Sequence, residues 1–143
     1  MTIHAFIDGA SRNNPGESGI GVILKDDQGA TLEQLSGYIG TATNNIAEYT
    51  ALVACLKLVN TMQCRKLLVH SDSELMVKQL KGEYRVKDAA LKEHFRTVRS
   101  LLKQASFEFE IQHVAREENK EADRLANEGI DTKRPVALSQ LFQ

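Results

Sequence analysis

The chain has 143 residues, of which 42% are hydrophobic, and its formal net charge is −1. This length and apolar content suit one domain with a single core and exclude a wholly disordered chain. No apolar run approaches the ~18 residues of a membrane-spanning helix, and the start of the chain does not resemble a secretory signal, so we expect a cytoplasmic protein without a membrane partner. Cys55 and Cys64 lack metal-ligand spacing and fit reduced thiols.

The first forty residues predict three consecutive β-strands. Two apolar strands, over residues 2–8 and 18–25, are followed by the turn sequence DDQG, and a third strand over 30–38 completes a meander. Asp8 lies at the end of the first strand, directly before a glycine and a run of small polar residues. This position needs a reason, because a carboxylate beside buried apolar residues is rarely left unpaired.

Helices and strands alternate after the meander. Thr43 is placed to cap the first helix, in which apolar residues from Tyr49 to Val59 recur at helical spacing and predict one buried stripe. The pattern indicates a mixed sheet covered by helices in one domain over 1–130, followed by a loosely ordered tail over 131–143. The predicted elements are a helix over 44–60, a strand over 66–72, helices over 73–81 and 88–105, a strand over 107–114 and a helix over 119–130.

Basic residues gather on one side of the 88–105 helix. Residues 78–103 hold eight basic and three acidic side chains, so the rest of the chain is net acidic. This separation suits a basic docking surface and an acidic site elsewhere, although an ordinary solvated helix face is the alternative. Four of the basic residues share the spacing of the buried face but sit about 100° around the helix axis. They form the basic flank: Lys92, Arg96, Arg99 and Lys103.

Four carboxylates are predicted to meet at one edge of the sheet. If a right-handed crossover through the 44–60 helix makes the first and fourth strands parallel neighbours, Asp8 and Asp72 emerge at the same edge. Glu48 lies early in the crossover helix and Asp123 in the first turns of the last helix, near that edge. Taken singly, each acid also fits a turn, a cap or a solvated surface, and the sequence Asp-Ser at 72–73 suits a helix start.

Converging carboxylates would repel one another, and a divalent cation removes that conflict. Ligand sets made only of oxygen suit Mg²⁺ or Mn²⁺ rather than zinc. Two such ions roughly 4 Å apart form the usual clamp for displacement at a phosphodiester. The four acids therefore point to two divalent ions and phosphodiester chemistry.

Four motifs occur in order, within a match that spans about residues 3–128. They are IDGASRNNPGESGIG, TNNIAEYTAL, HSDSELMVKQL and HVAREENKEADRLAN. Together they resemble type 1 ribonuclease H. The resemblance implies a ribonuclease H-like α/β fold, with a five-stranded mixed sheet (a three-strand meander plus parallel strands) flanked by helices. It also implies a catalytic domain that hydrolyses the RNA strand of RNA–DNA hybrids endonucleolytically and leaves 5′-phosphate and 3′-hydroxyl ends. The metal-binding catalytic residues would be Asp8, Glu48, Asp72 and Asp123.

The same resemblance implies residues that contact the substrate. Asn44 and Asn45 match the pair that reads RNA in the minor groove, where amides can recognise 2′-hydroxyls and base edges. Thr43 matches a threonine that holds a phosphate of the DNA strand, and Asn14 matches the asparagine of the glycine–proline loop. Roles as a helix cap for Thr43 and a turn residue for Asn14 are compatible with these contacts.

The resemblance is to a compact form of the family. Many members carry a histidine in a glycine-containing loop before the last helix, but the stretch AREEN has neither residue. Arg116, Glu117 and Glu118 are the candidates to replace it. His113 shares a strand face with apolar residues and is predicted to be a packed core histidine, as are the histidines of the first and fourth strands. The sequence GEYRVKD is too short for the basic protrusion of some relatives, which leaves substrate binding to the basic flank and the sheet-edge loops.

Two other functions remain open from the sequence. One is a nuclease on the same scaffold that acts on double-stranded RNA or branched DNA. The other is a non-catalytic nucleic-acid-binding module, against which the complete set of four acids counts. We expect a monomer. The final VALSQLFQ is predicted to fold back on its own domain, with weak docking to a protein partner as the alternative.

Overall fold

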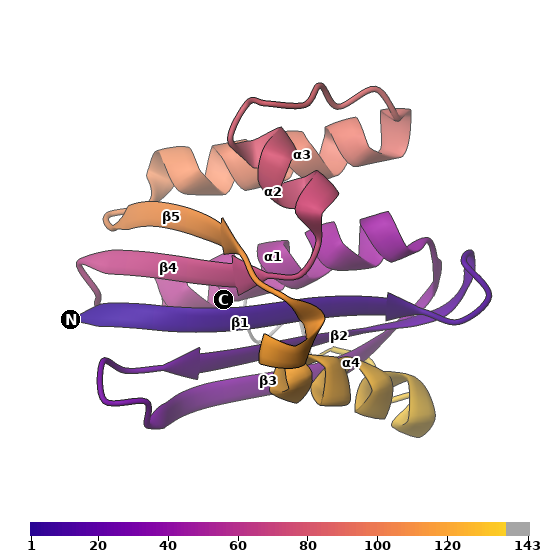
Figure 1. The fold of residues 1–143 in the computed structure, drawn as a ribbon, viewed down its shortest axis with the longest axis horizontal. Helices are drawn as coiled ribbons and strands as arrows, with labels where there is room; N and C mark the ends of the chain where they lie inside the picture. Colours follow the sequence, from indigo (N-terminus) through magenta and orange to yellow (C-terminus); the bar gives the residue numbers. More distant parts are fainter. Residues whose placement is uncertain (137–143) are drawn as a thin grey trace.

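The computed structural model describes residues 1–136, and its elements follow the predicted order (Figure 1). The antiparallel ladders of the meander extend to the pairs Ser11–Ser18 and Gly16–Ala42, so its strands run further than predicted. The elements are β1 Thr2–Ser11, β2 Gly16–Lys25, β3 Thr31–Ala42, α1 Asn44–Asn60, β4 Lys66–Ser71, α2 Glu74–Leu80, α3 Ala89–Gln104, β5 Glu108–His113, the short 3₁₀ turn η1 Arg116–Glu118 and α4 Lys120–Thr132.

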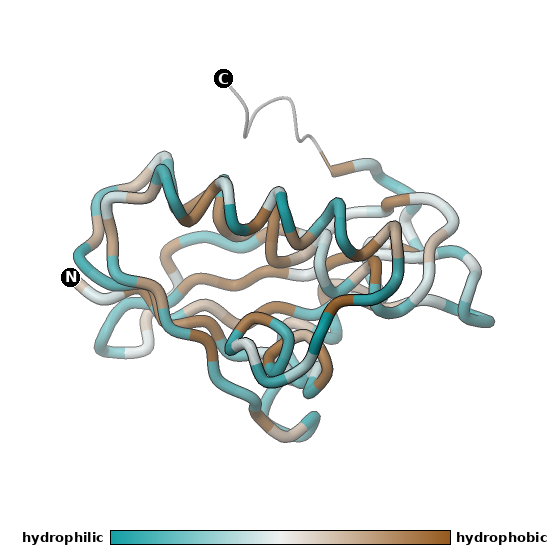
Figure 2. The backbone as a smooth tube through the Cα atoms, turned by 90° about the horizontal axis from the view of Figure 1, so that it is seen from above, coloured by the Kyte–Doolittle hydropathy of each residue, from teal (hydrophilic) through white to brown (hydrophobic). Residues whose placement is uncertain are grey.

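The five strands form one mixed sheet in the order β3-β2-β1-β4-β5. The meander pairs are antiparallel, whereas β4 runs parallel to both β1 and β5. Helix α1 lies behind the sheet in Figure 1 and α4 lies in front of it. Figure 2 shows the hydrophobic stretches concentrated in the central strands and helices, with more hydrophilic chain in the loops. This confirms the predicted five-stranded sheet flanked by helices.

Helix α1 is buried far more completely than its predicted single stripe. It packs on β1 and β2 on one side and on α3 on the other, so apolar residues are needed around most of its circumference. The sequence pattern shows which positions of the helix are apolar, but it does not show how many other elements pack against them. The buried residues of α1 are Ala47, Glu48, Tyr49, Ala51, Leu52, Ala54, Cys55, Leu56 and Val59.

The prediction that His113 is a core residue is wrong, because its side chain is exposed. It is the last residue of the edge strand β5, paired with Ser71 where the ladder ends. The other two strand histidines are packed but only partly buried, so they lie at the margin of the core and not within it. The ring of His70 stacks on Phe6 with centroids 4.4 Å apart, and His4 pairs with an aspartate in the β2–β3 turn.

The segment after α4 packs against the edge strand β3. Helix α4 ends at Thr132, two residues past the predicted end, and Lys133 adopts a left-handed conformation with φ 53°. The amide of Tyr38 then donates a 2.7 Å hydrogen bond to the carbonyl of Arg134. Val136 fills the space that Gly37 leaves beside β3. The prediction of a loosely ordered tail is therefore wrong for residues 131–136, which continue α4 and then pair with β3. Only the first residue of VALSQLFQ is described, so its folding back and the domain limit at 130 stay predictions.

Among the helices that the structure describes, none combines the length and the apolar character needed to cross a bilayer.

Candidate active site

Asp8 and Asp72 lie at the same edge of the sheet because β1 and β4 are parallel neighbours. The last pair in their register joins Ile7 to Ser71, and each aspartate follows its member of this pair directly. Asp72 follows the end of β4, as predicted. Asp8 differs from the prediction because β1 continues to Ser11 through its pairing with β2 alone. Asp8 thus emerges where β4 stops covering β1.

Glu48 reaches this edge because α1 lies unusually close to β1. A Cβ atom on Gly9 would sit 2.2 Å from the carbonyl carbon of Ala47, so only glycine permits the approach. The Gly9 amide donates a 2.7 Å hydrogen bond to Glu48 Oε1. The hydroxyl of Ser71, which is fully buried, lies 3.4 Å from Glu48 Oε2 and donates to it. Two neighbouring strands therefore hold both oxygens of this carboxylate.

The structure brings all four predicted acids to one cleft of about 390 Å³. Carboxylate oxygens of Asp8, Glu48 and Asp72 lie within 4.8 Å of one another. Asp123, from the first turns of α4, completes the acid lining of this cleft but is not part of that tight group of three. The amide of Asn127, one turn further along α4, donates to the Asp123 carboxylate at 3.3 Å. The predicted convergence is confirmed, with Asp123 at the margin of the cluster.

The electrostatics of the cluster are unfavourable without a cation. Burial raises the pKa of Asp8, and the charge of Glu48 and then that of Asp72 raise it further. Burial also raises the pKa of Glu48, although its hydrogen bonds to Asp8 and the Gly9 amide oppose the rise. Acids arranged in this way share protons when no cation is present. A hard divalent ion bound by carboxylate oxygens would replace those protons, so the donor set fits Mg²⁺ or Mn²⁺.

The asparagines predicted to contact substrate lie beside the acids. Asn44 and Asn45 line the same cleft at the start of α1. The side-chain oxygen of Asn44 accepts a 2.9 Å hydrogen bond from the Ser11 amide. The side chain of Asn14 in turn accepts a 2.9 Å bond from the Asn44 backbone amide. Asn14 thus orients Asn44, although it is not one of the residues that line the cleft.

Thr43 caps α1, as predicted. Its hydroxyl accepts a 3.1 Å hydrogen bond from the amide of Ile46, and its backbone is extended. The hydroxyl keeps its own proton for a further acceptor, since a threonine oxygen can donate one hydrogen bond while accepting others. The capping role therefore leaves a phosphate contact available.

The basic flank does not line the acidic cleft. Its residues are exposed on α3, while Leu91 and Val98 on the inner side of that helix are buried, and α3 packs on α1. The basic helix face is therefore exposed and separate from the acids, and its role in docking stays a prediction. The flank residues are Lys92, Arg96, Arg99 and Lys103.

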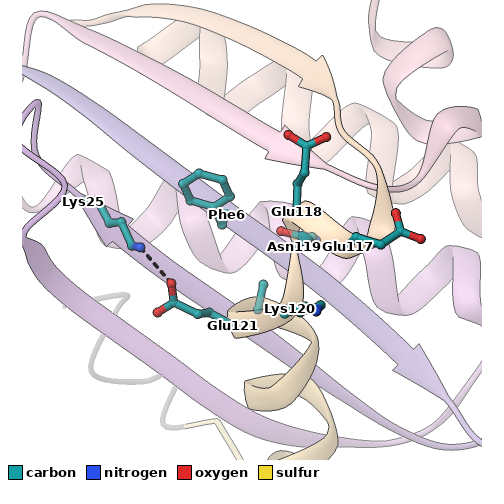
Figure 3. A pocket seen from close by; sticks show the side chains of 8 residues that line it. Phe6, Lys25, Glu117, Glu118, Asn119, Lys120 and Glu121 are labelled. Atoms are coloured by element: carbon teal, nitrogen blue, oxygen red, sulfur yellow. Dashed lines mark hydrogen bonds and ion pairs between the residues drawn. The ribbon is translucent and has the colours of Figure 1, made fainter.

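The turn before α4 distinguishes the three candidates for the missing loop histidine. Arg116 lines the acidic cleft. Glu117 and Glu118 line a separate pocket of about 210 Å³, together with Phe6 and an ion pair between Lys25 and the first turn of α4 (Figure 3). Because a 3₁₀ turn places successive side chains about 120° apart, only one of the three faces the acids. Sequence reasoning could not make this choice.

Ser11 and Ser71 of the site were not predicted, and Ser73, expected only at the start of a helix, also lines the cleft. Ser71 holds Glu48, and Ser11 is linked to Asn44 and lines the cleft. Each lies within three positions of an acid in one of the four motifs, which is the only sequence signal that could have indicated them. Their roles depend on contacts with α1 that the local sequence does not record.

The sheet and the carboxylate cluster at its edge define a ribonuclease H-like fold with a site suited to divalent cations. Residues 6–129 match a family model described as reverse transcriptase-like. The chain is 39% identical over 130 residues to ribonuclease HI of Halobacterium salinarum, which covers 90% of this chain and 64% of that protein. It is 31% identical to ribonuclease H of Methylococcus capsulatus, over 91% of this chain and 90% of that protein.

Solved structures are similar over almost the whole chain. LC11-RNase H1, crystallised in complex with an RNA/DNA hybrid, is 40% identical and superimposes with a TM-score of 0.87 over 91% of this chain and 97% of that one. The chain belongs to the type 1 ribonuclease H family. It spans just under two thirds of the Halobacterium protein.

Proposed function

We propose that this chain is an endonuclease that hydrolyses the RNA strand of RNA–DNA hybrids and leaves 5′-phosphate and 3′-hydroxyl ends. The observation that carries the proposal is the group of three carboxylates, Asp8, Glu48 and Asp72, within 4.8 Å of one another. The cleft that holds them is also lined by two asparagines. The similarity to LC11-RNase H1, which was crystallised with a hybrid, supports the choice of substrate.

The four acids would hold two divalent ions, Mg²⁺ or Mn²⁺. When bound, such ions activate the attacking water and neutralise the charge that develops on the phosphate and the leaving oxygen. Glu48 is oriented for this role by the Gly9 amide and the Ser71 hydroxyl. Asp123 is partly exposed, so it can hold an ion at the side of the cleft that is open to substrate.

Asn44 and Asn45 would recognise the RNA strand. The Asn44 side-chain oxygen already accepts from Ser11, which leaves its NH₂ group to donate to a 2′-hydroxyl or a base edge. Asn45 is exposed, so both ends of its amide are accessible. Asn14 and Thr43 would fix the start of α1 and offer polar groups to a phosphate of the DNA strand. The 2′-hydroxyl contact is the chemical basis for choosing RNA over DNA.

Arg116 would take the place of the loop histidine. It is the residue of the turn that lines the acidic cleft, and its side chain is exposed. A guanidinium keeps its charge at all relevant pH values and binds phosphate oxygens in pairs. Its contribution would therefore be electrostatic, through contact with the phosphate, and not the transfer of a proton.

The basic flank on α3 would bind phosphates away from the reacting group. Because the flank does not line the cleft, it would increase the affinity for the nucleic acid and make that affinity depend on salt. It would take no part in the cleavage step. All four acids come from one chain, so a monomer is sufficient for the proposed site. Size-exclusion chromatography with light scattering tests the monomer.

One assay tests the proposed function. Labelled RNA–DNA hybrid, double-stranded RNA and double-stranded DNA are incubated with Mg²⁺ or Mn²⁺ and either the wild type or Asp8→Asn. We expect metal-dependent cutting of the hybrid, with loss of cutting but retention of binding in the variant. Equal cutting of double-stranded RNA would indicate a broader nuclease, and binding of nucleic acid without cutting would indicate a binding module.

A further inference from the structure

Asn119 attaches the start of α4 to β1. Its side-chain Nδ2 donates a 2.8 Å hydrogen bond to the backbone carbonyl of Ile7, 112 positions earlier in the sequence. Its backbone carbonyl accepts a 3.1 Å hydrogen bond from the amide of Asp123. Asn119 therefore contacts both the residue before Asp8 and Asp123 itself, and it links the backbones that carry these two acids.

The structure gives the Asn119 amide one side-chain hydrogen bond, the one to the Ile7 carbonyl. Asn119 is only 1% exposed, and no described residue donates a hydrogen bond to its Oδ1. Asn119 is also one of the residues that line the pocket of about 210 Å³ beside Phe6 (Figure 3). The Asn119 side chain does not cap α4. What the position does require is a donor that can reach the Ile7 carbonyl.

The other close contacts of α4 set its distance from the sheet. Cβ atoms on Gly19 and Gly21 would lie 2.3 Å and 2.2 Å from the carbonyl oxygens of Ala126 and Ala122, so the helix lies directly on the strand backbone. These contacts involve β2, not β1. Asn119 provides the hydrogen bond to β1 at the residue where the ladder with β4 ends and the cleft begins.

Figure 3 shows Asn119 beside β1, with the side chains of Glu117 and Glu118 directed elsewhere. We propose that Asn119 is a positioning residue that sets the location of Asp123 relative to Asp8, and thereby the affinity of the site for divalent cations. This inference rests on the proposed metal-dependent function. Asn119 does not line the acidic cleft, so its effect would pass through the two acids it links.

The test uses variants that remove the side-chain amide whose Nδ2 reaches the Ile7 carbonyl. Asn119→Leu keeps the number of side-chain heavy atoms, and Asn119→Ser places a preferred N-cap residue at the start of α4. Gln79→Met is the matched control, because Gln79 is another buried amide, is hydrogen-bonded to Tyr49 and does not line the acidic cleft. For each protein, Tm is measured without metal, Mn²⁺ affinity by calorimetry, and kcat and KM on the hybrid.

We expect Mn²⁺ affinity and kcat to fall about 10- to 100-fold in both Asn119 variants, as for other residues that orient metal ligands. KM should stay near the wild-type value, raised Mn²⁺ should restore much of the rate, and Gln79→Met should keep wild-type affinity. Unchanged Mn²⁺ affinity in either folded variant would overturn the proposal. The proposal would also be overturned if Mn²⁺ affinity and kcat in the Asn119 variants fell only in proportion to Tm and Gln79→Met showed the same proportion. If the wild type binds Mn²⁺ but cuts no hybrid, the proposed function fails, while the affinity measurement still tests Asn119.

Discussion

The backbone amide of Gly9 and the carboxylate of Glu48 are joined by a 2.7 Å hydrogen bond, although 39 positions separate them in the sequence. The bond forms because Gly9 has no Cβ, which lets α1 lie against β1 at the level of the acids. The same contact that packs the helix on the sheet therefore orients a carboxylate of the proposed metal site. Packing and chemistry are coupled at this residue.

Substituting Gly9 should affect metal binding as well as stability. Gly9→Ala places a methyl group 2.2 Å from the Ala47 carbonyl carbon, which must push α1 away and move Glu48. We expect a loss of about 1–3 kcal/mol in the free energy of unfolding, as for other overpacked sites, and a further loss of Mg²⁺-dependent activity in the folded protein. Gly129→Ala is the matched control, since its Cβ would lie 2.4 Å from the Gly37 carbonyl oxygen, away from the acids. Equal losses of activity per folded molecule in the two variants would contradict the coupling.

The metal-free protein should lose stability as pH rises. Burial and neighbouring acids raise the folded-state pKa of Asp8 above its ordinary value of 3.8. A group of this kind contributes stability below its unfolded pKa and loses it as pH rises through the interval up to the folded pKa. The free energy of unfolding should therefore decrease when metal is absent, from about pH 4, near the ordinary pKa of Asp8, toward its raised pKa of about 11.

Asp8→Asn should remove most of that pH dependence. Near neutral pH the metal-free variant should be more stable than the wild type by on the order of 1–3 kcal/mol, because a neutral amide replaces a buried, repelled acid. Addition of Mg²⁺ should raise the Tm of the wild type but not of the variant. Urea unfolding across the pH range checks both points, and parallel pH profiles for the two proteins would argue against the electrostatic account.

Removing the guanidinium at position 116 should slow cleavage without abolishing it. We expect Arg116→Ala to lower kcat about 100-fold, the typical effect of losing one preorganised charge contact in a reacting centre. Arg116→Lys should retain part of the activity. Arg116→His should make the rate depend on pH near neutrality, where imidazole titrates. Arg65→Ala is the control, since Arg65 is exposed at the opposite end of the sheet, and equal effects at 65 and 116 would refute the role.

Asn45 should contribute to the choice of RNA over DNA. Asn45→Ala should raise KM for the hybrid by about five- to tenfold, the effect of losing roughly one hydrogen bond, and leave binding to double-stranded DNA unchanged. Asn60→Ala, at the other end of the same helix and also exposed, is the matched control. Competition binding with hybrid and DNA duplexes provides the measurement. A parallel loss of affinity for both duplexes would assign Asn45 to general backbone contact.

The basic flank should increase the affinity for the nucleic acid and make this affinity depend on salt. Removing Lys92 and Arg96 together should raise KM, leave kcat unchanged, and lower the slope of log affinity against log salt by up to about 0.9 for each phosphate that the wild-type side chains neutralise. Lys66→Ala removes a basic residue that pairs with Glu110 at the start of β4 and serves as the control. If the double variant kept the wild-type salt dependence, the flank would be an ordinary solvated surface that does not bind phosphates.

Local patterns were sufficient to predict much of the fold. Helix α1 begins and ends where the cap at Thr43 and the apolar spacing placed it, and the alternation in β5 predicted a strand, because both signals depend on near neighbours in the chain. The prediction that His113 is a core residue was wrong because its burial does not depend on near neighbours in the chain. Burial of a strand end depends on how distant segments pack over it, and the end of β5 stays exposed at the edge of the sheet.

The sequence by itself determined the order of the elements and the identity of the four acids, because strand ends, caps and ordered motifs are properties of neighbouring residues. Only the tertiary structure decided that Arg116 faces the acids while Glu117 and Glu118 do not. It also decided that Asp123 lies outside the tight carboxylate group and that Asn119 reaches the Ile7 carbonyl. These relationships depend on the direction of side chains and on contacts between distant segments, which form only when α1 and α4 pack on opposite faces of the sheet.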